Sequence, residues 1–346
     1  MLASGCRTLS VMGMTKNTGK TVALNHVLAQ AAAAGVPMGV TSIGRDGEAF
    51  DQVFQVPKPP VQVWPGSLVA TARDTLPRAK APTHWVADTG IPSPMGEIVL
   101  VQVLEQGEME IAGASRASDQ RAVITRLQQA GAALVLLDGA LGRSQHASPA
   151  ITDGVILATG AAQGGGMHDV LRKTRDRLAI LGIAQADAHT RQLTQPVFEQ
   201  GGVGVWDRQG NNLLLANIST LNSAPALMQK AQADIKTIAL SGAVGRRLWG
   251  ALQSLAMLHP DQTVVVNDGT KLFVDQAELT ALQQKGVQVQ AYQAIRLVGI
   301  TLNPFSPFGG SFDATEFLAA ARSALAGHTV CDVLLDGPMN TTGVFA

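Results

Sequence analysis

The residues best suited to chemistry lie near the amino terminus, in the stretch 13–21, which reads Gly-Met-Thr-Lys-Asn-Thr-Gly-Lys-Thr. Its last three residues, Gly19-Lys20-Thr21, end the stretch as a phosphate-binding loop ends. In such a loop, backbone N–H groups and the positive end of the next helix cradle phosphate oxygens. The lysine reaches the terminal phosphates and the threonine hydroxyl holds Mg²⁺. We therefore expect ATP and Mg²⁺ to bind here, with Lys20 as a catalytic residue and Thr21 as a metal ligand. The expected nucleotide contacts are Gly13, Lys16, Asn17, Thr18, Gly19, Lys20, Thr21 and, later in the chain, Arg45.

A phosphate loop needs a strand before it and a helix after it. The apolar run 9–12 predicts the strand, and the alanine-rich run 21–34 predicts the helix. The spacing departs from the common form G-x-x-x-x-G-K-[ST], because Gly13 lies one residue too early. This longer spacing resembles the loop of dethiobiotin synthetase, in the branch of P-loop proteins that includes the MinD-like ATPases. The extra lysine of MinD-type loops has no equivalent, since Lys16 is one position too close to Lys20. The alternative is a glycine-containing turn that happens to precede a helix.

Carboxylates at strand ends supply candidate Mg²⁺ ligands. Asp138 follows the apolar run 132–137, as the acidic residue of a Walker B strand does, and is expected to be catalytic and metal-bound. Asp46 follows the predicted strand 38–43 and is a second metal candidate, beside Arg45 as a partner for phosphate. Asp88 ends another strand-like run and is a weaker candidate. The alternative for Asp138 is a strand-ending turn, that for Asp46 is a polar turn with a solvated ion pair, and that for Asp88 is a helix or turn cap.

Composition excludes several classes of function. The chain has 26 basic and 26 acidic residues, so no global charge attracts it to nucleic acid or to an anionic membrane. No uninterrupted apolar segment approaches the ~20 residues that span a bilayer. Cys6 and Cys331 lie near opposite ends and predict neither a zinc site nor a disulfide framework. We expect a reduced, cytoplasmic protein.

The order of strand and helix patterns predicts an α/β protein. A P-loop NTPase-like, mostly parallel sheet is expected in residues 1–182. A second α/β domain, for partner or substrate interaction, is expected in residues 183–346. Within the first domain, 66–73 reads as a short helix, the apolar run 97–104 as a strand of a parallel sheet, and 167–181 as a helix. In the second domain, 276–284 reads as a helix and 295–302 as a strand.

Several short stretches resemble the KamB-type subunit that is encoded with adenosylcobalamin-dependent lysine and ornithine aminomutases. Besides the loop 13–21, they are Thr-Ser-Ile-Gly-Arg-Asp-Gly-Glu (41–48), Asp-Gly-Ala (138–140), Ala-Ser-Pro (147–149), Thr-Asp-Gly (152–154), Ala-Thr-Gly (158–160), Asn-Pro-Phe-Ser-Pro (303–307) and Phe-Asp (312–313). The resemblance implies NTP-driven exchange of damaged cobalamin from an inactivated aminomutase, together with a MutS-like partner, KamC. It places Lys20 and Thr21 at phosphate and Mg²⁺, and Asp138 on the Mg²⁺ side. No Asp-x-His-x-x-Gly cobalamin motif is present, so the client enzyme would hold the cofactor.

Two other functions fit the same residues. One is a biosynthetic enzyme of the dethiobiotin synthetase type, in which ATP activates a small carboxylate. The other is a regulatory subunit that binds nucleotide without hydrolysis, because no water-positioning residue is evident. No Asn-Lys-x-Asp guanine motif is present, which favours ATP over GTP.

Overall fold

The computed structural model describes residues 5–43, 60–138 and 151–336. They form an α/β protein with two large mixed sheets, which confirms the expected fold class at this level. They divide into two compact units. The first contains the described residues up to Thr174 and those from Arg296 onward, and the second is Arg175–Ile295. Within the described ranges, no helix combines the length and the apolar character that crossing a lipid bilayer requires.

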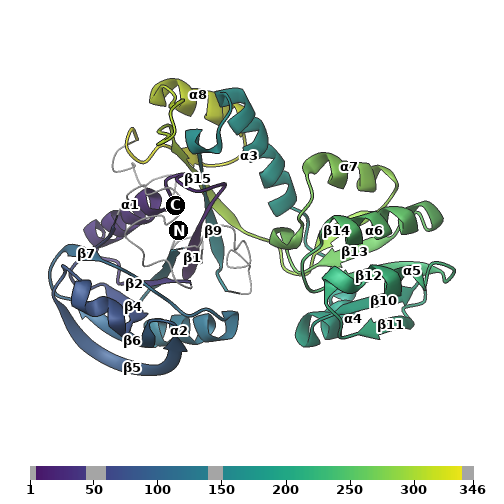
Figure 1. Ribbon diagram of the computed structural model, residues 1–346, viewed down its shortest axis with the longest axis horizontal. Coiled ribbons are helices and arrows are strands. Elements are labelled where there is room, and N and C mark those ends of the chain that lie inside the picture. The colour runs from purple at the N-terminus through teal and green to yellow at the C-terminus, as the bar shows by residue number, and fades with distance from the viewer. Residues whose placement is uncertain (1–4, 44–59, 139–150, 337–346) are drawn as a thin grey trace. The chain divides into compact units, whose positions relative to one another are not determined.

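Nine described strands form the sheet of the first unit (Figure 1). They are β1 (Thr8–Gly13), β2 (Met38–Ser42), β4 (Leu68–Ala72), β5 (Thr83–Ser93), β6 (Gly96–Val103), β8 (Leu134–Asp138), β9 (Gly154–Gly160), β15 (Leu297–Asn303) and β16 (Val330–Cys331). Their order is β16-β15-β9-β1-β8-β2-β4-β6-β5. Neighbours from β16 to β4 are parallel, whereas β6 is antiparallel to both β4 and β5. The carboxyl ends of the parallel strands therefore share one edge, where open α/β sheets place their ligands.

Helices cover both faces of this sheet. The described helices of the first unit are α1 (Lys20–Ala33), α2 (Ala117–Gln129), the first half of α3 (Met167–Leu181) and α8 (Ala314–Ala324). Leu136 of β8 belongs to the same buried cluster as Leu24 of α1, whereas its neighbour Leu137 belongs to that of Leu127 in α2. Successive strand side chains point to opposite faces, so α1 and α2 lie on opposite sides. All four leucines are fully buried, and each contributes about 1.5–3 kcal/mol by leaving water.

A short antiparallel pair, β3 (Val61–Val63) and β7 (Gly107–Met109), adds to the α1 side of the core. Asn25 of α1 holds this pair in place. Its side-chain amide donates to the Pro60 carbonyl at 2.9 Å and accepts from the Gln62 N–H at 3.0 Å. One asparagine thus joins a helix to a distant backbone segment through both ends of its amide.

The second unit has its own sheet and core. Its strands are β10 (Val203–Asp207), β11 (Asn212–Ala216), β12 (Ile235–Leu240), β13 (Thr263–Val266) and β14 (Gln288–Ala291), in the order β11-β10-β12-β13-β14. The three strands from β12 to β14 are parallel, and β10 is antiparallel to both of its neighbours. The helices wholly in this unit are α4 (Ala188–Gln200), α5 (Ala224–Met228), α6 (Arg246–Leu258) and α7 (Gln276–Gln284). Trp249 of α6 is 2% exposed and packs in the buried cluster of this unit.

The division of the chain differs from the expected domains 1–182 and 183–346. The first boundary lies inside α3, between Thr174 and Arg175, and the residues from Arg296 onward return to the first unit. They return because β15 pairs with β9, where Ile300 lies opposite Leu157. This pairing satisfies the backbone groups along the side of β9 that faces away from β1.

Two expected elements of the first unit are also corrected. The stretch 66–73 was expected to form a helix, but residues 68–72 form β4, and all five are buried between β2 and β6. Its sequence, LVATA, has no strong preference against either structure, so burial on both sides decides. The apolar run of β6 was expected in a parallel arrangement and is antiparallel.

Candidate functional site

The stretch 13–21 lies between β1 and α1, as the phosphate-loop interpretation requires. Gly13 ends β1 and Lys20 begins α1. The Met14 N–H donates to the Ala158 carbonyl of β9 at 2.9 Å, which fixes the start of the loop. Asn17 (φ 61°) and Gly19 (φ 88°) adopt left-handed conformations that asparagine and glycine accept most readily. Right- and left-handed residues in succession turn backbone N–H groups toward a common point, which suits an anion.

The interior of the loop is closely packed around Gly13. A β-carbon on Gly13 would lie 2.6 Å from Thr18 Oγ1, 2.9 Å from the Thr15 carbonyl oxygen and 3.0 Å from Lys20 Cδ. Thr18 is 1% exposed and its hydroxyl donates to the Thr15 carbonyl at 3.0 Å. Glycine is therefore required at position 13 by close approach, and the Lys20 side chain folds back over the end of β1. Lys16 also lies in the loop and is half-buried.

The amino terminus of α1 carries no side-chain cap. Gly19 occupies the capping position, and the first turn contains no acidic residue. The first N–H groups of a helix have no partner within the helix, and together with the helix dipole they favour an anion. Thr21, in this first turn, is 6% exposed. Its hydroxyl is an oxygen donor of the kind that Mg²⁺ prefers.

Asp138 ends β8 between the two strands that flank it. It lies opposite Val11 of β1 and Ser42 of β2, and it is 2% exposed. Because Asp138 is two residues beyond Leu136, its side chain points to the α1 side of the sheet. The structure thus places Asp138 on the strand next to β1, on the face that carries Thr21.

Sequence reasoning missed one residue that touches the loop. Asn303, at the end of β15, donates from Nδ2 to the Asn17 carbonyl at 2.9 Å. Its β-carbon lies 3.1 Å from where a β-carbon on Gly19 would stand. In the sequence, an Asn-Pro pair directly follows the predicted strand 295–302. This pair indicates where the strand ends, but it does not indicate which residues lie beside that end.

Asp88 is not part of this site. It lies within β5, five strands from β1, or roughly 24 Å at the usual spacing between strands. Its carboxylate accepts from Arg73 at 2.7 Å, and the side chains of Arg73 and Asp88 are 50% and 58% exposed. Asp88 was expected to end its strand, but β5 continues to Ser93 through an irregular register. Asp88 therefore takes part in an exposed ion pair, which is neither the expected metal site nor the helix or turn cap that was its alternative.

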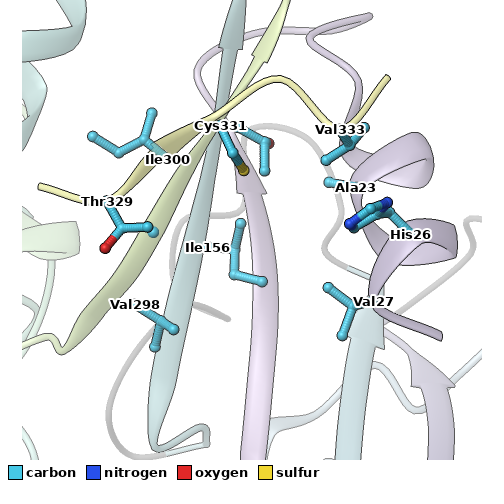
Figure 2. Close-up of a pocket in the computed structure, with 11 residues that line it drawn as sticks. Ala23, His26, Val27, Ile156, Val298, Ile300, Thr329, Cys331 and Val333 are labelled. Atoms are coloured by element: carbon cyan, nitrogen blue, oxygen red, sulfur yellow. The ribbon is translucent and has the colours of Figure 1, made fainter. Parts of the chain in front are cut away.

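A small apolar cavity of about 30 Å³ lies between α1 and the strands β9, β15 and β16. Figure 2 shows His26 and Val27 of α1 facing Val298 and Ile300 of β15 across it. Burial lowers the pKa of His26, whose Nε2 has no hydrogen-bond partner among the described residues. Burial also raises the pKa of the Cys331 thiol to about 11. Both shifts favour uncharged side chains, so the cavity belongs to the core.

The loop Ser241-Gly242-Ala243 of the second unit packs against its neighbours. The Ser241 hydroxyl accepts from the Gly202 N–H at 2.7 Å and donates to the Gly202 carbonyl at 3.0 Å. A β-carbon on Gly242 would lie 2.5 Å from Thr220 Oγ1. At this strand end, Ser241 therefore hydrogen-bonds to the backbone of Gly202, and Gly242 allows close packing against Thr220.

Two expected contacts, Arg45 and Asp46, lie outside the described residues, as does the segment 139–150 that follows Asp138. The described residues contain no group of three or more His, Cys, Asp or Glu side chains placed to hold a metal ion. No family model, curated protein or solved structure matches the chain, so the function of the site is argued from its geometry and sequence.

Proposed function

We propose that the first unit is a P-loop NTPase-like domain that binds ATP with Mg²⁺. The observation that carries the proposal is the loop between β1 and the uncapped start of α1, with Lys20 folded over Gly13. Phosphate oxygens would accept from the loop N–H groups, and the Lys20 ammonium would compensate the charge of the terminal phosphates. The parallel block from β16 to β4 supports this assignment, because it brings the end of β8 beside the loop.

The available oxygen donors fit Mg²⁺. The Thr21 hydroxyl and the Asp138 carboxylate are hard donors, and Mg²⁺ is usually held by one or two such groups together with phosphate oxygens and water. When bound, the ion would neutralise charge on the β- and γ-phosphates. The chain's own contribution is to orient the nucleotide and to keep Asp138 away from bulk water.

We further propose that the hydrolysis of ATP assists reactivation of a cobalamin-dependent aminomutase, together with a MutS-like companion. The sequence resemblance to KamB-type subunits supports this part. Hydrolysis would switch the loops at the carboxyl edge of the sheet and so alter the contact with the client.

Nucleotide binding is tested by titration calorimetry with Mg²⁺ and a non-hydrolysable ATP analogue. Lys20→Ala should abolish measurable binding, because the charged contact to phosphate is lost, and should leave the melting temperature unchanged. The matched control is Lys80→Ala, which removes an exposed lysine paired with Glu108 at 2.6 Å. If Lys20→Ala binds the ATP analogue with wild-type affinity, the stretch 13–21 is not a phosphate-binding loop.

The client is tested by measuring ATP and GTP hydrolysis with and without the inactivated aminomutase and its MutS-like companion. Stimulation by these proteins supports the reactivase. A basal rate that ignores them but rises with a small carboxylate supports the biosynthetic alternative. Tight binding with no turnover under any of these conditions supports the regulatory subunit.

A further inference from the structure

Along the strand direction, Asn303 lies level with the candidate loop, beyond the carboxyl end of β1. It pairs with Gly160 of β9, whereas Gly13 pairs with Ala158 of the same strand. Asn303 is therefore two residues, or roughly 7 Å, further along the sheet than Gly13. From this position a short side chain reaches the loop across the end of β9.

Both ends of the Asn303 amide are used. Nδ2 donates to the Asn17 carbonyl at 2.9 Å, and Oδ1 accepts from the Phe305 N–H at 3.2 Å. The reverse orientation would place an NH₂ group against an N–H and an oxygen against a carbonyl, so the contacts define one orientation. The amide consequently joins the loop to the segment that follows β15.

Two glycines allow this close approach. A β-carbon on Gly160 would lie 2.1 Å from the Asn303 carbonyl oxygen, and one on Gly19 would lie 3.1 Å from the Asn303 β-carbon. Gly19 is left-handed (φ 88°), so glycine is favoured there for conformation as well as for space. Asn303 is thus held between the end of β9 and the start of α1.

The segment after Asn303 is folded on itself. The Phe312 N–H donates to the Pro304 carbonyl at 2.9 Å, and the Ser306 N–H donates to Ser311 Oγ at 3.0 Å. Phe305 and Phe308 on this segment are 61% and 57% exposed. These internal bonds make 304–312 a unit whose start is tied to the loop by Asn303.

We propose that Asn303 is a positioning residue for the nucleotide loop and couples its state to segment 304–312. The inference rests on the proposed nucleotide binding. In a trans peptide the C=O and N–H point in opposite directions, so holding the Asn17 carbonyl directs the Thr18 N–H away from β15. An anion that accepts from this N–H stabilises the same peptide orientation and therefore the Asn303 contacts. Coupling of this kind is reciprocal, so nucleotide should protect the Phe305 N–H from exchange with solvent.

The test compares three variants in the full chain. Asn303→Ala removes both contacts, whereas Asn303→Asp keeps the acceptor for Phe305 and loses the donor to Asn17. The matched control is Asn25→Ala, which loses an equivalent pair of backbone contacts away from the loop. Affinity for the Mg²⁺ complex of a non-hydrolysable ATP analogue is measured by calorimetry, and amide exchange of 14–20 and 304–312 by NMR or mass spectrometry.

Asn303→Ala should bind nucleotide about threefold to tenfold more weakly, the effect of one lost hydrogen bond, and Asn25→Ala should bind as the wild type does. Asn303→Asp should lose at least as much affinity, because its carboxylate also repels the Asn17 carbonyl and the phosphates. Without nucleotide, Phe305 should exchange faster in Asn303→Ala but not in Asn303→Asp. Extra protection on nucleotide binding should appear only in the wild type and the control. Unchanged affinity in both Asn303 variants, or an equal loss in Asn25→Ala, would overturn the inference and leave nucleotide binding intact. Absence of binding by the wild type would overturn both.

Discussion

Replacing Gly13 with alanine tests whether this glycine is the close-approach residue of a phosphate loop, despite its unusual spacing. The variant changes no charge. Gly13 has no positive φ, so alanine brings no backbone strain of that kind. Its methyl group would instead overlap Thr18 Oγ1 at 2.6 Å and the Thr15 carbonyl oxygen at 2.9 Å. The whole effect is therefore steric and falls on the loop.

The magnitude follows from the cost of overpacking a closely packed site, which is typically about 1–3 kcal/mol. The loop would relax away from the methyl group in the free protein and would have to return to bind phosphate. Nucleotide affinity should then fall by roughly 5- to 150-fold, since each 1.4 kcal/mol corresponds to about a factor of ten. The melting temperature should change little, because the rest of the core is untouched.

The assay is calorimetric titration with the Mg²⁺ complex of a non-hydrolysable ATP analogue, accompanied by a thermal melt. Gly166→Ala is the control, because a β-carbon there meets no atom within 4 Å and its φ is not positive. Adding Thr18→Ala to Gly13→Ala removes the nearest obstacle and should recover part of the lost affinity, measured against Thr18→Ala alone. Recovery is partial because the Thr15 carbonyl remains. An affinity within about twofold of the wild type in Gly13→Ala would refute the reasoning.

Two further predictions concern Asp138 and Cys331. Asp138→Asn should weaken the Mg²⁺ dependence of binding and turnover more than nucleotide affinity itself, because it removes a metal-side charge; unchanged metal dependence would assign the carboxylate to a turn. Burial, with Asp336 and Asp332 nearby, raises the pKa of the Cys331 thiol from 9.0 to about 11, so the folded chain keeps a proton in this window that the unfolded chain has released. Stability should therefore fall as pH rises from 9.0 to about 11, and Cys331→Ala should reduce that slope in urea unfolding. If stability falls equally steeply with pH in Cys331→Ala, the Cys331 thiol is not the group that causes the fall.

Local sequence signals identified the elements with strong start and stop residues. Helix α7 occupies the expected residues 276–284, and it begins with a capping box in which Asp275 and Glu278 bond to each other's backbone N–H. Helix α3 also has its expected bounds, 167–181. The strand, loop and helix around 13–21 were predicted for the same reason, because an apolar run, glycines and an alanine-rich run follow one another closely.

Other elements depend on partners far away in the chain. β4 is a strand because β2 and β6 lie on its two sides, and the sequence of residues 68–72 does not indicate that these strands are its neighbours. β5 runs through Pro92, which is acceptable because β5 is an edge strand of the described sheet. The direction of β6 could not be predicted either, because a continuous apolar run fits a buried strand of either orientation.

The candidate site depends on a local motif and on the order of strands in the sheet. Only the motif can be predicted from the sequence. Polar residues lie at or near the ends of several strands: Asp138 ends β8 and Asn303 ends β15, whereas Asp88 lies within β5. The parallel strands share one carboxyl edge, so distance from β1 along the sheet decides which of them can meet the loop. Asp138 is one strand away and Asn303 two strands away, whereas Asp88 is five. Asn303 comes that close only because β15 rejoins the first sheet after the whole second unit. A contact separated by 286 positions thus depends on a strand order that no local pattern specifies.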